Sequence, residues 1–113
     1  MTDAADGEIT TKPGRPEFAD VHEVTVEKVG QQTFRITASG FVQGYDWTVN
    51  LHASIYLHAP ETWIIDAVVI APTTPSAEVN VPWRASTELF LTLHTHRISV
   101  RGQGDTITKS VPW

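Results

Sequence analysis

Apolar and polar residues alternate strictly along the stretch from Trp47 to His58. Its odd positions are apolar, and its even positions carry side chains that can form hydrogen bonds. Successive side chains of a β-strand point to opposite faces. The alternation therefore predicts a twelve-residue strand with one apolar face and one polar face. In a helix, the same apolar residues would be spread around the whole surface.

Further strand-like segments follow one another at intervals of about ten residues, separated by turn-forming residues. We expect a hairpin of residues 20–29 and 33–42, with a glycine-first turn at Gly30-Gln31 and a bulge or bend at Gly40. The remaining expected strands are 63–71 in the centre of a sheet, 78–83 at an edge, and a hairpin of 98–101 and 106–111 around the turn 102–105. Residues 88–96 also favour a strand, because they alternate with period two and contain threonines, and a helix is the alternative there.

Seven or eight short strands joined in this way predict an all-β fold, an antiparallel β-sandwich. A small closed or partly open β-barrel is the alternative. Residues 1–19 lack apolar periodicity and contain two prolines. They predict a flexible N-terminal tail, with a short extended piece at 9–12, and residues 20–113 predict a single β domain.

Composition narrows the classes of partner. The 113 residues carry a formal net charge of −5 and contain no cluster of Lys or Arg. Phosphate backbones and anionic lipid surfaces are bound mainly through such clusters, so we expect neither nucleic acid nor a membrane as partner. The first residues do not resemble a secretory signal, and no apolar run approaches the ~20 residues of a membrane span. Together these features predict a cytoplasmic location.

Histidines are the strongest candidates for metal binding. The chain has no cysteine, which excludes a thiolate zinc site and a cysteine nucleophile. On a strand, His94 and His96 would share one face, about 6.5–7 Å apart along the backbone. Asp66 or a histidine of the long strand could complete a divalent metal site with an open position. The alternative is that the histidines are simply polar residues on a solvated face, with no cofactor.

Asp66 stands alone in an otherwise apolar segment. Buried carboxyl groups often gather at functional sites. The simpler interpretation, which we favour, is a structural contact with Arg35, Arg84 or a loop amide.

The polar face of the long strand and the nearby aromatic residues are the candidate binding surface. Trp47 and Trp63 lie in register with apolar neighbours and are expected in the core. Tyr and Trp elsewhere offer flat apolar faces with a polar group, which suits interfaces and stacking on sugars. The candidate binding residues are Asn50, His52, Ser54, Tyr56, His58, Tyr45 and Trp83.

Two functions agree with this pattern. The first, which we favour, is a non-enzymatic binding or interaction module for a protein, peptide or carbohydrate, with association of two copies through an edge strand as one form. The second is a small barrel whose polar residues line a cavity that binds or acts on a small molecule, with or without a metal. The two differ in whether the even-numbered side chains from Asn50 to His58 face solvent or an enclosed pocket.

Overall fold

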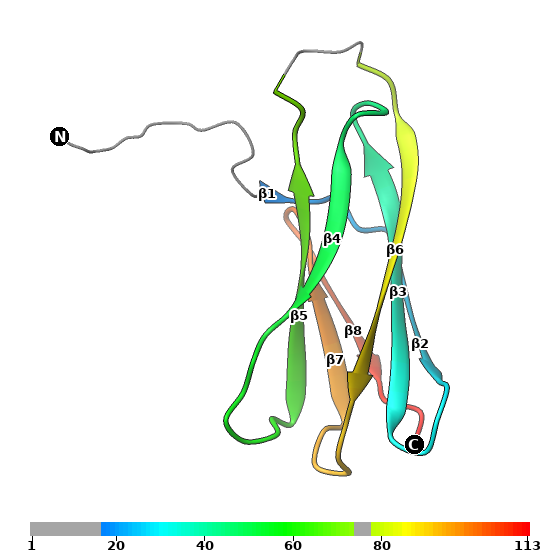
Figure 1. The fold of residues 1–113 in the computed structure, drawn as a ribbon, viewed down its shortest axis with the longest axis vertical. Helices are drawn as coiled ribbons and strands as arrows, with labels where there is room; N and C mark the ends of the chain where they lie inside the picture. The colour runs from blue at the N-terminus through cyan, green and yellow to red at the C-terminus, as the bar shows by residue number, and fades with distance from the viewer. Residues whose placement is uncertain (1–16, 74–77) are drawn as a thin grey trace, which may run out of the picture.

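The computed structural model describes residues 17–73 and 78–113, and in that part it shows two packed β-sheets and no helix (Figure 1). The sheets do not close into a barrel, so the predicted β-sandwich is confirmed. The strands are β1 Glu17–Phe18, β2 Glu23–Lys28, β3 Thr33–Val42, β4 Thr48–Ala53, β5 Thr62–Ile70, β6 Val81–Phe90, β7 Arg97–Arg101 and β8 Thr106–Ser110.

The larger sheet is built around β5, as its apolar sequence predicts. β4 pairs with one edge of β5, while β7 and the short β1 share the other edge, and β8 continues beyond β7. The β5–β7 pairing is parallel, and all others are antiparallel. The smaller sheet has the order β2-β3-β6. Consecutive strands therefore form hairpins in three places and cross between the sheets elsewhere.

The core lies between the sheets and is mostly aliphatic, with two large aromatic residues, Phe34 and Trp83. β3 supplies Phe34 and Ile36, β5 supplies Ile65, and β7 supplies Ile98 and Val100, all fully buried. The alternation in β3 puts Phe34, Ile36 and Ala38 inward and leaves Arg35 exposed on the outer face. Both the bounds and the buried face of this strand agree with the sequence prediction.

The long strand predicted at 47–58 is only half present. β4 begins at Thr48 and ends at Ala53. Beyond it, Ile55 and Leu57 are 97% and 98% exposed, so the apolar face does not continue. The Ser54 amide still donates to the Ile64 carbonyl at 3.0 Å, which continues the main-chain pairing with β5 one residue beyond β4.

Two other strand predictions are merged into one element. The expected strands 78–83 and 88–96 become the single strand β6, which pairs with β3 from Val42↔Val81 to Thr33↔Phe90. β6 is an edge strand, and this agrees with the presence of Pro82. The residues after Phe90 turn toward β7 and form no strand.

The two hairpin turns have different outcomes. Gly104 has φ +80° within the expected turn 102–105, and the Gly102 amide donates to the Asp105 carbonyl. At the β2–β3 turn, the amides of Val29 and Gly30 both donate to the Thr33 carbonyl. The φ of Gly30 lies outside the left-handed region, so the two-residue glycine-first turn is wrong.

The described residues contain no helix that could cross a membrane. Of the predicted tail, residues 17–19 are described, and β1 pairs with β5 there. The extended piece expected at 9–12 lies outside the described residues. The division into a tail and one domain stays a prediction.

Candidate functional site

Residues 17–22, which we call the strap, pass from the larger sheet to the smaller one. The Ala19 amide donates to the Ala67 carbonyl at 2.8 Å, and the Ala19 carbonyl accepts from the Gln103 amide at 2.7 Å. The Trp83 Nε1 donates to the Asp20 carbonyl at 3.0 Å. The strap is therefore held by main-chain and indole hydrogen bonds to both sheets.

Two glycines make room for the strap. A Cβ at Gly40 would overlap the carbonyl oxygen of Asp20 and lie 2.9 Å from Trp83 Nε1. A Cβ at Gly102 would lie 2.7 Å from the Ala19 carbonyl oxygen. Gly40 pairs with Trp83 in a continuous register, so the predicted bulge is wrong. A glycine is required here because the backbone of the strap passes close to it.

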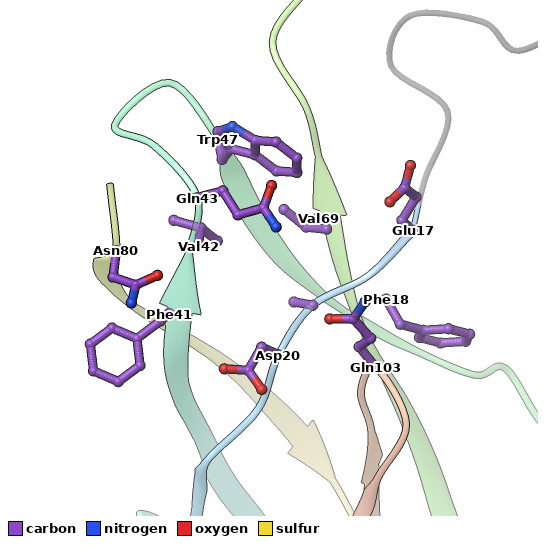
Figure 2. Close-up of a pocket in the computed structure, with 11 residues that line it drawn as sticks. Glu17, Phe18, Asp20, Phe41, Val42, Gln43, Trp47, Val69, Asn80 and Gln103 are labelled. Carbon is purple, nitrogen blue, oxygen red and sulfur yellow. The ribbon is translucent and has the colours of Figure 1, made fainter. Parts of the chain in front are cut away.

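A cleft of about 290 Å³ opens beside the strap (Figure 2). In Figure 2, Trp47 and Gln43 lie on one side of the strap, Gln103 lies on the other side, and Asp20 is part of the strap itself. The cleft joins segments that are far apart in the sequence, namely the strap, the β3–β4 turn, the end of β5, the start of β6 and the β7–β8 turn. Its lining is Glu17, Phe18, Ala19, Asp20, Phe41, Val42, Gln43, Trp47, Val69, Asn80 and Gln103.

The polar groups of the cleft are amides and carboxylates. Gln43, Asn80 and Gln103 each offer both a donor and an acceptor, whereas Glu17 and Asp20 offer acceptors. No Lys or Arg is among the lining residues. Such a surface favours a neutral or cationic ligand with several hydroxyl or amine groups and disfavours a phosphate.

The two carboxyl groups differ from a hydrolytic pair. Glu17 is exposed. The Asp20 carboxylate contacts His22 Nε2 at 2.7 Å, and the His22 ring packs edge-on against Phe41. Neither carboxyl group lies in the apolar surroundings that distinguish the general acid of a glycoside hydrolase.

The residues predicted on the polar face of the long strand are not among those that line the cleft. Asn50 and His52 are exposed on the outer face of β4, and His58 is exposed in the loop that follows. Ser54 and Tyr56 are half-buried and lie beyond the end of the strand. The alternative of a barrel is wrong, because the two sheets do not close, and Asn50, His52 and His58 face solvent rather than the interior of a barrel.

Tyr56 has a structural contact instead. Its hydroxyl oxygen accepts a hydrogen bond from the Ile64 amide at 3.1 Å, where β4 no longer pairs with β5. Its ring packs edge-on against Trp63, with ring centroids 5.0 Å apart. The side chain thus caps the free edge of β5.

The remaining aromatic candidates differ in their exposure to solvent. Tyr45 is 82% exposed in the β3–β4 turn. Trp83 is only 9% exposed and is hydrogen-bonded beneath the strap, so its prediction as a surface residue is wrong. Trp47 and Trp63 pack against the core as expected, although Trp47 also lines the cleft.

The predicted histidine pair is not on a strand. His94 and His96 lie in the β6–β7 loop, on either side of the fully buried Thr95. Among the described residues, no group of three His, Cys, Asp or Glu side chains could hold a metal ion. The shared strand face that suggested a metal site is therefore wrong.

Asp66 forms an ion pair with Arg101, rather than with Arg35 or Arg84. The Arg101 Nε and a terminal nitrogen lie 2.6 and 3.1 Å from the two carboxylate oxygens. This hydrogen bonding, together with the opposite charge, raises the pKa of the Arg101 guanidinium. The guanidinium also lies 5.8 Å from the centre of the Phe18 ring, which links β1 to the pair.

Replacing Asp66 should reduce stability more than replacing any other paired carboxylate. The Asp66 side chain is 26% exposed, against 51% for Glu88 and 66% for Glu61, and its pair is bidentate. We expect Asp66→Ala to lower the melting temperature by several degrees and Glu61→Ala to have almost no effect. Thermal denaturation followed by circular dichroism checks this order, and equal effects of the two substitutions would contradict it.

The cleft residues carry little local signal in the sequence. Gln43 and Gln103 stand in turns, where amides are ordinary residues, and Glu17 and Asp20 stand in or beside the expected tail. The sequence offers one indirect sign, the two glycines. A side chain at Gly40 or Gly102 would collide with main-chain atoms of the strap, so these glycines mark where another backbone segment passes close by.

Comparison with protein-family models, with curated proteins and with solved structures gives no match for this chain.

Proposed function

We propose that this domain is a non-enzymatic binding module whose cleft takes a neutral, polyhydroxylated ligand, a carbohydrate. The chemistry of the lining carries the proposal: amide and carboxylate side chains surround a partly buried indole, with no cation among them. Sugar hydroxyl groups both donate and accept hydrogen bonds, and their apolar C–H faces stack on aromatic rings.

The size of the cleft agrees with a small ligand. Its volume of about 290 Å³ is close to the lower limit of ligand pockets, which is roughly 300 Å³. The cleft is open to solvent at the end of the sandwich, so a terminal residue of a longer chain can enter without the whole chain being enclosed. The strap and both sheets are joined by hydrogen bonds, which keeps the lining preorganised.

Binding can be tested with a panel of neutral oligosaccharides, namely glucans, xylans, mannans and chitin fragments, with heparin as an anionic comparison. We expect at least one neutral oligosaccharide to change the tryptophan fluorescence, because Trp47 lines the cleft, and heparin to have no effect. Gln43→Ala and Gln103→Ala should each weaken that binding about tenfold, as expected when one or two hydrogen bonds to a ligand are lost.

A matched control is Gln31→Ala, which removes an exposed glutamine of the β2–β3 loop outside the cleft. It should bind like the unaltered protein, and chromatography should recover the oligosaccharide unchanged. Binding that resists both cleft substitutions, or no binding by any neutral oligosaccharide, contradicts the proposal. Association of two copies through an edge strand stays a separate prediction, and light scattering on a size-exclusion column tests it.

A further inference from the structure

Two loops present large aliphatic side chains to solvent. The β4–β5 loop, residues 54–61, carries Ile55 and Leu57 at 97% and 98% exposure, and the β6–β7 loop, residues 91–96, carries Leu93 at 71%. We call these three side chains the tip. Figure 1 shows both loops at the opposite end of the molecule from the β3–β4 turn, which lines the cleft. Several exposed apolar side chains at one end of a molecule are candidates for an interaction surface.

The base of the tip is held firmly by hydrogen bonds between the two loops. The hydroxyl of Thr95, which is fully buried, donates to the Pro60 carbonyl at 2.7 Å. The amides of His96 and Arg97 both donate to the Glu61 carbonyl, at 2.9 and 3.2 Å. These hydrogen bonds join the two loops at their bases, so both loops are held at the same end of the sandwich.

Tyr56 fixes the direction of the β4–β5 loop. Its ring is packed on Trp63 and its hydroxyl is bonded to the Ile64 amide. The residues on either side, Ile55 and Leu57, are left without neighbours that cover them. The loop thus presents two almost fully hydrated aliphatic side chains next to an anchored aromatic one.

The area of the tip disfavours a protein partner. A standard interface takes about 800 Å² from each partner and has a packed, roughly flat centre. Three aliphatic side chains on two loops supply far less than this. Penetration into a lipid layer needs no complementary pocket, because acyl chains rearrange around each side chain.

The polar groups around the tip suit lipid headgroups. The two loops contain three exposed histidines, His58, His94 and His96, whose ring N–H groups can donate to phosphate oxygens. The single acidic residue of the two loops is Glu61, whose Oε1 lies 3.3 Å from a terminal nitrogen of the Arg97 guanidinium. The whole chain has a net charge of −5. Because the two loops carry little of this negative charge, anionic headgroups repel them only weakly.

We propose that the tip docks this domain on the surface of a phospholipid bilayer, with Ile55, Leu57 and Leu93 entering the boundary between headgroups and acyl chains. The sequence led us to expect no membrane partner because it contains no cluster of Lys or Arg. A cluster of positive charge is one way to bind a bilayer. Exposed aliphatic side chains bind its interface in another way, through the apolar area that they bury.

Co-flotation with unilamellar vesicles tests the proposal. Two kinds of vesicle serve as probes. One contains phosphatidylcholine alone, and the other contains phosphatidylcholine with about one-third phosphatidylglycerol, which gives the surface a clear negative potential. We expect the protein to float with both. The double substitution Ile55→Ser and Leu57→Ser should reduce the partition coefficient at least about tenfold, because each methylene withdrawn from lipid weakens partitioning roughly fourfold.

Tyr45→Ser is the matched control, since it removes an exposed aromatic side chain outside the tip, and it should float like the unaltered protein. Both variants should keep the melting temperature, because the side chains that they change are exposed. Failure of the protein to float with either vesicle overturns the proposal, as does a serine variant that floats normally. A dimer in sedimentation equilibrium that the serine pair abolishes, without vesicle binding, assigns the tip to a second copy and also overturns it.

Discussion

Replacing Gly40 with Ala should destabilise the protein by about 3 kcal/mol or more, although alanine is ordinarily the better residue in a strand by about 0.5–1 kcal/mol. The added methyl group would overlap the Asp20 carbonyl oxygen and approach Trp83 Nε1, which donates to that same oxygen. Overpacking of this kind costs about 1–3 kcal/mol, and the lost hydrogen bond about 1 kcal/mol more. Urea denaturation of both proteins measures the difference.

Gly30→Ala is the control for this prediction. Its Cβ would lie 3.3 Å from the Thr33 Cβ, a side-chain contact that a small shift relieves, and its φ is ordinary. We expect a change below about 1 kcal/mol, with reduced entropy of the unfolded chain offsetting part of the contact. Gly102→Ala, which would crowd the Ala19 carbonyl at 2.7 Å, should lie between the two. A Gly40→Ala protein as stable as the unaltered one would show that the strap does not cross β3 here.

Replacing Trp113 with Ala should lower the free energy of unfolding by about 2–3 kcal/mol, which is less than the 3–5 kcal/mol of a fully buried aromatic residue. The indole packs edge-on against Phe34, with centroids 4.8 Å apart. Its Nε1 donates to the Thr95 carbonyl at 2.8 Å, and Lys28 Nζ donates to its main-chain oxygen. The melting temperature should fall by about 10 °C or more.

Trp113→Phe separates the two contributions, because it keeps an aromatic ring against Phe34 and removes the indole N–H. We expect it to cost about 1 kcal/mol, the usual value of one hydrogen bond. If Trp113→Ala and the unaltered protein unfold at the same temperature, Trp113 does not pack on the core in solution.

The parts of the fold that could be predicted are those in which a local pattern and burial agree. In β3, Phe34, Ile36 and Ala38 alternate with polar residues, and the strand has neighbours on both edges. The two-residue period of the sequence and the position of the strand in the sheet therefore both favour a strand with one buried face. β5 is similar, since its continuous apolar run matches its central position.

The alternation between Trp47 and His58 was misleading in its second half. Strand periodicity there is as regular as in the first half, but β5 offers β4 partners only from Ile70 back to Ile65. Tyr56 then supplies the hydrogen bond that the ladder would have made to the Ile64 amide. Nothing in the local pattern distinguishes Leu51, which packs against the core, from Leu57, which is exposed.

The cleft could not be predicted because its residues come together only through the topology. Glu17 and Gln103 are brought to one end of the sandwich by the pairing of β1 and β7 with the same edge of β5. A sequence pattern shows which residues share a face of one strand, but not which turns of different strands meet. The candidate residues of the long strand were chosen by the first criterion, and of these only Asn50 and His52 lie on the solvated outer face of β4.

The cleft and the tip lie at opposite ends of the sandwich (Figure 1). A domain docked through the tip would therefore hold the cleft away from the bilayer, where a carbohydrate in solution can reach it. The two proposals rest on different residues, and either can fail without the other.

The most direct test of the cleft as ligand site is an NMR titration with the tightest-binding neutral oligosaccharide of the panel. The account predicts shifts of the Trp47 indole N–H and of the side-chain amides of Gln43 and Gln103. It also predicts no shifts at Asn50 and His52 on the outer face of β4. Shifts confined to Asn50 and His52, with the cleft signals unmoved, would contradict it.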